Sequence, residues 1–274
     1  KIVLDPVMVA KGGAKLIDNQ ERVIYAREIW FDTTKNLFEA SGNVIIIDPV
    51  QKIKIYSENI IYKKEENIIL TKVDSKLIDE DQKIINAKNF LFDLSNNIFR
   101  STGDVKLLDP LNNYEMTSNQ INYFKNEEKI TTKGKTNFKL NSKYDLKSKN
   151  IIFYNKNMKI SSIEKASIHD YKNKALYQLE NFSLSLENEI LKGENISINT
   201  NIDLPYNDKY FLKSGIFDLK NQAFVTKDID INLKKDLFGN NDNDPRIKGV
   251  SASSKDGITT INKGIFTSCK KNED

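Results

Sequence analysis

The chain has 274 residues, of which 39% are apolar and 29% charged, and its formal net charge is +4. Enough apolar residues are present to bury a core, so the composition excludes an intrinsically disordered chain. A single cysteine excludes an internal disulfide framework, and no apolar run approaches the roughly 18 residues that a membrane-spanning helix needs.

Ile, Leu, Phe and Tyr dominate the apolar residues, and Asn and Lys fill the gaps between apolar runs. This composition is typical of β-strands joined by short turns. Lysines alternate with Asp and Glu, which predicts solvated strand faces first and attraction to an acidic partner only second. We expect no nucleic-acid partner. The first residues lack the basic-then-apolar pattern of a signal peptide, so we expect that a signal was removed or that the sequence is a fragment.

In chain order, residues 8–18 match the second half of a repeated unit, and five full units follow. Each unit has an aromatic anchor, and the anchors are 30 or 31 residues apart: Phe31, Tyr62, Phe92, Tyr123 and Phe153. The positions seven and two residues before each anchor are always apolar, and the position five before is always small. Weaker anchors at Leu184 and Phe217 extend the series to seven units. Such a period indicates a repeat architecture.

The second half of each unit has large residues at its ends and small residues in its middle. Seven residues past the anchors stand Phe38, Ile69, Phe99, Ile130 and Ile160, and fifteen past them stand Ile46, Leu77, Leu107, Phe138 and Ile168. Nine past the anchors stand Ala40, Thr71, Ser101, Thr132 and Ser162. These columns share one parity along a strand, so we expect them to face one interior.

Polar clusters such as residues 32–36 and 93–97 separate the halves of each unit, and Asp48-Pro49 and Asp109-Pro110 join successive units. Both are turn signals, and they predict a long antiparallel meander. In the first strand of each unit the apolar columns change parity, which strict alternation cannot do without a bulge or bend. We therefore expect an all-β fold, an antiparallel array of bent strands resembling an open jelly roll. The array is predicted to cover residues 1–233, and residues 234–274 to be a linker toward missing sequence.

The small residues at mid-strand predict a trough lined by apolar side chains, with room for acyl chains. Each lipid methylene removed from water contributes on the order of 0.8 kcal/mol, so repeated equivalent sites suit lipid transport. The alternative is that small residues merely permit the bend while the sheet fills its own interior. The predicted groove residues are Phe38, Ala40, Val44, Ile46, Ile69, Leu77, Phe99, Ser101, Val105, Leu107, Ile130 and Phe138.

The sequence contains few residues of the types that carry out catalysis. His169 is the only histidine and is expected in an exposed turn, and no Cys or His cluster has metal-ligand spacing. The recurring aspartates at 18, 48, 79, 109 and 170 are interpreted as turn caps rather than as paired catalytic carboxylates. We therefore expect no enzyme activity, no cofactor and no metal. A parallel β-helix that acts on polysaccharides, or an adhesin, is the competing class, and parallel strand pairing would favour it.

Two segments carry a family resemblance: Gly42-Asn43-Val44-Ile45-Ile46-Ile47-Asp48 and Gly103-Asp104-Val105-Lys106-Leu107-Leu108-Asp109. They resemble the OstA family of lipopolysaccharide-transport proteins, in which an aromatic anchor precedes a Gly-Asn-Val-like strand. The resemblance covers about residues 8–233. It implies a bent-strand "β-taco", lipopolysaccharide as the ligand, and a place at the periplasmic face of the outer membrane.

The tail, through residues 238–249 and 262–269, resembles the join to the β-barrel in the family's outer-membrane assembly member. This resemblance implies a barrel and its lipoprotein plug as partners, and a disulfide between Cys269 and a cysteine outside this sequence. An unpaired thiol of no consequence is the alternative for Cys269. The strand around residues 8–18 has no preceding partner, so we expect it to dock a homologous strand-array bridge protein. The soluble bridge and membrane-anchored components of the same family remain alternatives for the whole chain.

Overall fold

A computed structural model describes residues 6–204, 207–239 and 242–270. Strands hold 67% of the residues and helices 3%, so the chain is all-β. It divides into two compact units, unit 1 with residues 1–136 and unit 2 with residues 137–274. Among the described residues, no helix is long and apolar enough to cross a membrane.

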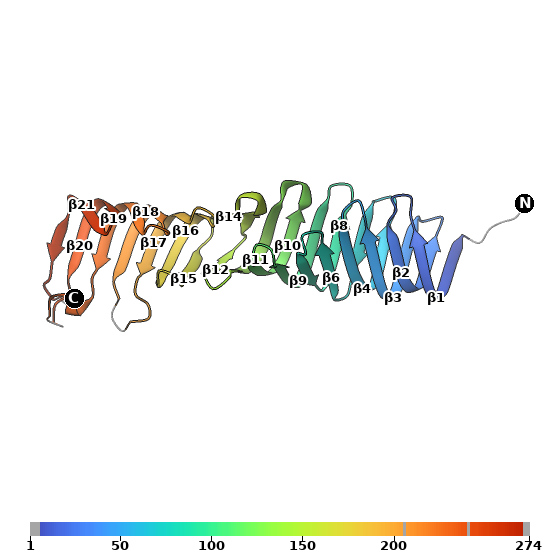
Figure 1. Cartoon of the computed structure of the whole chain (residues 1–274), viewed down its shortest axis with the longest axis horizontal. Coiled ribbons are helices and arrows are strands. Elements are labelled where there is room, and N and C mark those ends of the chain that lie inside the picture. The colour runs from blue at the N-terminus through green and yellow to red at the C-terminus, as the bar shows by residue number, and fades with distance from the viewer. Residues whose placement is uncertain (1–5, 205–206, 240–241, 271–274) are drawn as a thin grey trace, which may run out of the picture. The chain divides into compact units, whose positions relative to one another are not determined.

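Unit 1 is built from consecutive strands that lie side by side (Figure 1). They are β1 (Val7–Ile17), β2 (Val23–Asp32), β3 (Leu37–Asp48), β4 (Ile53–Lys63), β5 (Ile68–Thr71), β6 (Ser75–Asp79), β7 (Ile84–Ala87), β8 (Asn89–Asp93), β9 (Ile98–Asp109) and β10 (Tyr114–Phe124), followed by the 3-10 turn η1 (Lys125–Glu127). The chain then runs from unit 1 into unit 2 through β11 (Lys129–Leu140).

Unit 2 continues the same pattern of short turns and paired strands. Its elements are β12 (Tyr144–Lys149), β13 (Ile152–Tyr154), η2 (Asn155–Asn157), β14 (Lys159–Ser162), β15 (Ala166–Asp170), β16 (Ala175–Ser185), β17 (Ile190–Asn199), β18 (Lys209–Asp218), β19 (Ala223–Asn232), η3 (Lys235–Phe238), β20 (Arg246–Lys255), β21 (Ile258–Asn262) and β22 (Ile265–Thr267).

Strand pairing in both units is antiparallel, as in β2 with β3 and β17 with β18. The antiparallel fold predicted from the sequence is therefore confirmed, and a parallel β-helix is excluded for these strands. The turn-capping role of the aspartates is confirmed as well. Carboxylate oxygens of Asp48, Asp79 and Asp109 each accept a backbone N–H three or four residues later, at 2.7 to 2.9 Å.

Each long strand of unit 1 bends at a corner. Between Ser41 and Val44 the register of β3 against β4 shifts, because Gly42 and Asn43 stand opposite the single residue Glu58. Gly42 has φ +79° and Asn43 has φ +49°, conformations that glycine and asparagine tolerate best. The sequence predicted a bulge or bend in the first strand of each unit, and the strands do bend there. The extra residue that accompanies the bend lies on the second strand, where it leaves the parity of the inward columns unchanged.

The corners divide the sheet of unit 1 into two walls. Wall A runs from the corners to the turns at 18–22, 48–52, 79–83 and 109–113, and wall B runs to the turns at 32–36, 63–67, 93–97 and 125–128. Strand β4 shows the division, because it pairs with β6 in wall A and with β5 in wall B. In both walls alternate side chains are buried, so the two inner faces form the core.

Strand pairing continues beyond residue 233, in the region that the sequence predicted to be a linker. Strand β20 pairs with β19 over most of its length, and β21 and β22 both pair with β20. His169 was expected in an exposed turn, and this was wrong. It lies in β15, half-buried, with its ring stacked 4.0 Å from that of Tyr171.

Candidate functional site: an apolar interior closed by a polar seam

The predicted groove residues all lie in the core, and each is at most 4% exposed. Phe138 belongs to unit 2 and the others to unit 1. The columns seven, nine, thirteen and fifteen residues past the first five anchors are buried throughout, so the prediction that they face an interior is confirmed within each unit. Because large side chains from both walls fill this space, the predicted trough of unit 1 is a closed interior in this structure.

The small residues near the corners have a structural role of their own. The hydroxyl of Ser75 donates to that of Ser57 across neighbouring strands at 2.9 Å. Thr71 Oγ1 accepts the backbone N–H of Phe90 at 3.0 Å, where β8 begins. Thr136 Oγ1 lies 2.7 Å from Thr132 Oγ1. These hydroxyls satisfy polar groups where the backbone ladder is interrupted.

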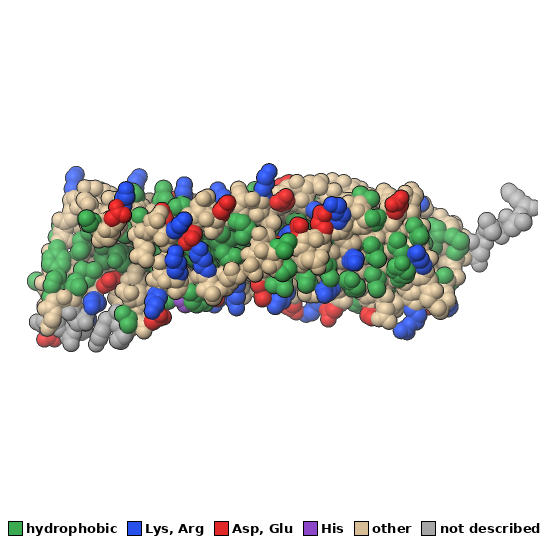
Figure 2. Space-filling model, viewed as in Figure 1, with side chains coloured by type: hydrophobic (Ala, Val, Ile, Leu, Met, Phe, Trp, Pro, Cys, Tyr) green, Lys and Arg blue, Asp and Glu red, His purple; other side chains and the backbone are tan. Residues whose placement is uncertain are grey.

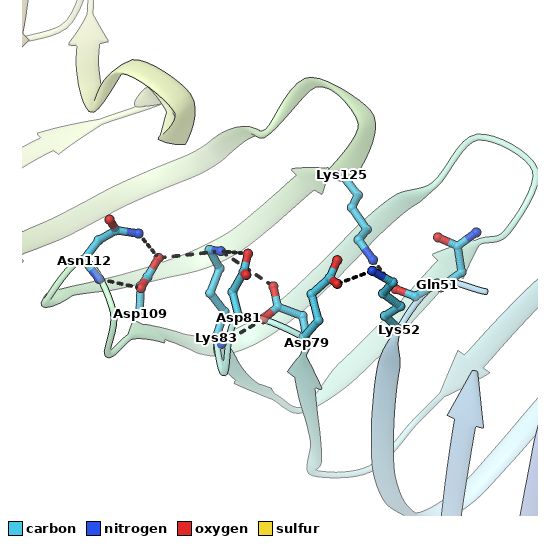
Figure 3. Close-up of polar contacts among 9 residues, drawn as sticks. Gln51, Lys52, Asp79, Asp81, Lys83, Asp109, Asn112 and Lys125 are labelled. Carbon is cyan, nitrogen blue, oxygen red and sulfur yellow. Dashed lines mark hydrogen bonds and ion pairs between the residues drawn. The ribbon is translucent and has the colours of Figure 1, made fainter. Parts of the chain in front are cut away.

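In unit 1 the walls meet again opposite the corners, along a line that we call the seam, where wall A turns approach the ends of wall B strands. Lys83 lies there, with its ammonium 3.0 Å from an Asp81 oxygen, 3.8 Å from Asp79 and 3.7 Å from Asp109 (Figure 3). Asp109 is fully buried, and Lys83 and Asp79 are 5% and 3% exposed. Asn112 holds both oxygens of Asp109.

The seam charges depend on one another because they are buried. Burial alone would lower the pKa of Lys83, but Asp79, Asp81 and Asp109 raise it above its ordinary value. Burial raises the pKa of Asp79, and Lys83 opposes that rise. Burial also raises the pKa of Tyr123, a wall B residue that senses the charge of Lys83, to about 12. Removing one partner would leave the others uncompensated in a medium of low polarity.

Two further contacts cross the seam of unit 1. Lys125, at the end of β10, donates to the carbonyl oxygen of Gln51 in a wall A turn (Figure 3). Arg22, which is 3% exposed, places Nε 2.6 Å from an Asp18 carboxylate oxygen and donates from Nη2 to the Tyr62 hydroxyl at 3.1 Å. The Arg22 guanidinium also lies over the Tyr62 ring, 5.0 Å from its centroid. Polar contacts therefore close an apolar interior.

Sequence reasoning missed these seam residues, although a signal was present. Arg22 and Lys83 stand nine residues before their anchors, on the parity that points inward. Other copies carry Ile53, Tyr114 and Tyr144 at the same position. A cation in a column that is otherwise apolar or aromatic marks a buried charge that needs a partner.

A seam of the same kind closes unit 2. The Glu189 carboxylate lies 2.8 Å from the Lys143 ammonium and accepts the Tyr144 hydroxyl at 3.5 Å. Burial would raise the pKa of Glu189, but Lys143 lowers it below its ordinary value. Asn173 Nδ2 donates to the carbonyl oxygen of Leu219 at 2.9 Å, and the Gln222 side chain donates to Asn173 Oδ1 at 3.1 Å.

Inside this seam, unit 2 contains a cavity of about 280 Å³. Its lining includes Tyr177, Ile198, Leu212, Phe217 and Phe224, together with the seam residues Asn173 and Gln222. The rings of Tyr177 and Phe217 pack edge to face across it, 5.8 Å apart. At about 30 Å³ for a group the size of a water molecule, the cavity has room for several methylenes.

No family model matches this chain, and no curated protein matches it closely enough to be called a relative. The assignment of function therefore depends on the residues and on their resemblance to the OstA pattern. Within the part of the chain that the structure describes, no three His, Cys, Asp or Glu side chains are placed to hold a metal ion.

Both ends of the described chain expose apolar groups. In β1, Met8 and Val9 are 56% and 50% exposed. In the last strands, Ile258 and Ile265 are 72% and 73% exposed, and Figure 2 shows hydrophobic side chains gathered over β20 and β21. Cys269 is an exposed free thiol, and its carbonyl oxygen accepts a hydrogen bond from Arg246 at 3.3 Å.

Proposed function

We propose that this chain is the periplasmic strand array of an LptD-type lipopolysaccharide-assembly protein, and that it conducts lipopolysaccharide acyl chains through its apolar interior. The observation that carries the proposal is the repeat itself. Inward columns stay apolar or small in copy after copy, so neighbouring strands offer an acyl chain nearly equivalent surroundings. Equivalent sites lower the barrier to sliding while burial holds the chain.

Conduction through a closed interior requires the seam to open. Breaking one hydrogen bond of the seam costs on the order of 1 kcal/mol. Burying five methylenes stabilises the bound state by on the order of 4 kcal/mol. Acyl chains can therefore open several polar contacts one after another, and these contacts close again behind them. The cavity behind Asn173 and Gln222 is a place where this opening would begin.

The remaining parts of the proposal follow from the family resemblance. The chain would act at the periplasmic face of the outer membrane, with an outer-membrane barrel and the lipoprotein plug of that barrel as partners, and Cys269 would pair with a cysteine outside this sequence. The edge of β1 opposite β2, which pairs with no other strand among the described residues, would receive a strand of the homologous bridge protein. A bridge component of the same family is the second candidate, and the continuation of paired strands beyond residue 233 favours it.

Photoactivatable lipopolysaccharide tests the proposal with the purified chain. A diazirine in an acyl chain should label inward residues such as Phe38 and Leu107, and a diazirine on the saccharide should label seam residues such as Arg22. Deacylated lipopolysaccharide should not compete with the acyl probe. Acyl labelling spread over outward residues, with the inward columns unlabelled, would contradict conduction through the interior.

A further inference from the structure

The outer face of wall A carries a line of apolar side chains that runs straight across the strands of unit 1. Each residue of this line stands opposite the next one in the strand register. The line runs through Ile17, Val23, Ile47, Lys54, Ile78, Ile84 and Leu108. Only Lys54 interrupts the line. Ile17 is 59% exposed, and most of the others are half-buried among their neighbours.

A second outward line runs beside the first, nearer the corners. It contains Lys15, Tyr25, Ile45, Tyr56, Lys76, Asn86 and Lys106. The surface beside this line is hollowed by two cavities of about 490 and 720 Å³, which share Asn43 in their linings. Tyr25 lines the first cavity, and Ile45 and Tyr56 line the second. Both hollows follow the corners, where the small residues Ser57 and Ser75 line the larger one together with Glu58, Asp74 and Asp104.

The charge within these two lines is positive up to β9, and the first carboxylate beside them is Glu115 on β10. From β1 to β9, the two outward lines of wall A hold four lysines and no carboxylate. Asp104 pairs with Lys88 and Glu80 with Lys52 on the rims, and Glu115 pairs with Lys106 at 3.1 Å, so one of the four lysines is compensated. Among the described residues, neither Lys54 nor Lys76 takes part in an ion pair. The face therefore presents uncompensated positive charge beside exposed apolar groups.

Wall B provides an internal comparison, because the same strands form it. Its outward positions carry Glu28, Glu39 and Asp93 as well as Lys11, Lys63 and Arg100. Lys11 pairs with Glu28 at 3.2 Å, and Lys63 pairs with Glu66 at 2.8 Å. Wall B also has an outward apolar line, through Val9, Trp30, Ile61, Leu70 and Leu91, so such a line is a property of both walls. The charge distinguishes them, because wall B carries both signs on its outward positions.

We propose that the outer face of wall A docks on an anionic lipid surface. Lysines attract acidic headgroups, tyrosines favour the boundary between headgroups and acyl chains, and long lysine stems let apolar neighbours approach the surface. A protein partner is less suited, because protein interfaces are depleted in lysine and these two lines contain four lysines. The proposal is independent of lipid conduction through the interior.

Co-sedimentation of the whole chain with vesicles tests this docking. Vesicles with roughly 30% phosphatidylglycerol in phosphatidylcholine should bind the chain at low salt, and pure phosphatidylcholine vesicles should bind it much less. One lysine near an anionic surface is worth about 1 kcal/mol, or about fivefold in partitioning. The double variant Lys54→Gln/Lys76→Gln should therefore partition about 25-fold less. The matched wall B variant Lys63→Gln/Arg100→Gln should change partitioning less than about twofold.

The apolar contribution has a matched pair on a single strand. Ile17→Ser on wall A should weaken binding severalfold, whereas Val9→Ser on wall B, which is similarly exposed, should not. Equal losses from the two walls, or equal binding to neutral vesicles, would overturn the proposal, and an acidic protein would then be the partner class to test. These vesicles contain no lipopolysaccharide, so their result does not bear on conduction.

Discussion

Lys83→Met should destabilise the protein by about 3 kcal/mol, because it leaves buried carboxylates at the seam without their cation. Removing one partner of a buried ion pair costs about 3–5 kcal/mol. We expect the lower end for two reasons. Asp81 is 56% exposed and can be solvated, and Asp109 keeps two hydrogen bonds from Asn112, at 2.9 and 2.8 Å. Urea unfolding followed by far-ultraviolet circular dichroism measures the change.

Lys52→Met is the matched control. Lys52 pairs with Glu80 at 2.6 Å on the same edge of wall A, but the two side chains are 62% and 43% exposed. Exposed pairs contribute about 0–1 kcal/mol, so this variant should stay close to the parent. The double variant Lys83→Met/Asp79→Asn should recover part of the loss. A loss below about 1 kcal/mol for Lys83→Met would refute the view that the seam charges hold the walls together.

The same pair gives a pH dependence with a defined sign. The folded-state pKa of Lys83 is raised above 10.5, so its stabilising contribution is complete below that pH and is lost as the pH rises through the folded value. In the Lys83→Met variant, the raised pKa of Asp79 determines how the stability of this region changes with pH. A carboxyl group with a raised pKa favours the folded state at low pH and loses that effect as the pH rises. The deficit of the variant should therefore be smaller near about pH 4 than near about pH 8.

Three further predictions concern other parts of the molecule. Gly42→Ala should cost roughly 1–2 kcal/mol more than Gly12→Ala in urea unfolding, because both glycines have positive φ but only at Gly42 would the new Cβ meet another atom, at 2.7 Å from Arg27 Cβ. Tyr62→Phe should lower stability by about 1–2 kcal/mol, since it removes an acceptor from the buried Arg22, and an unchanged midpoint would count against that contact. In the full-length protein in its membrane, Cys269 should be oxidised to a cysteine outside this sequence, and complete alkylation of its thiol without reduction would contradict this.

The repeat made the strand order and the inward columns predictable from the sequence. Positions such as Phe38 and Ile46 alternate with polar residues, and a slip of one residue would turn every apolar side chain to the solvent. The bend of the first strands was predicted, but the bulge on the second strands was not, for a local reason. Gly42 and Asn43 add one residue to β3 in left-handed conformations, and the inward residues on both sides of them are still two or four positions apart. The sequence pattern of β3 therefore gives no sign of the bulge.

The closure of the interior was harder to predict, because it depends on how closely the two walls approach. The sizes of Ala40 and Ser101 fit both an open trough and a packed bend, and only the contacts between the walls distinguish them. The strands after residue 233 were missed because their apolar residues, such as Ile258 and Ile265, are exposed. They do not show the alternation of buried apolar and exposed polar positions by which the other strands were recognised. The outward lines of wall A could have been found, since Ile47 and Ile78 share one column sixteen residues past their anchors.

Photo-crosslinking during active transport tests the central claim most directly. Photoreactive amino acids would be placed at Phe38, Ala40, Ser101 and Leu107, which are at most 4% exposed, and at Lys64 in an exposed turn as the control. We predict that the four inward positions capture lipopolysaccharide only while transport runs, and that Lys64 does not. Equal capture at all five positions, or none at the inward positions of an active protein, would contradict conduction through the interior.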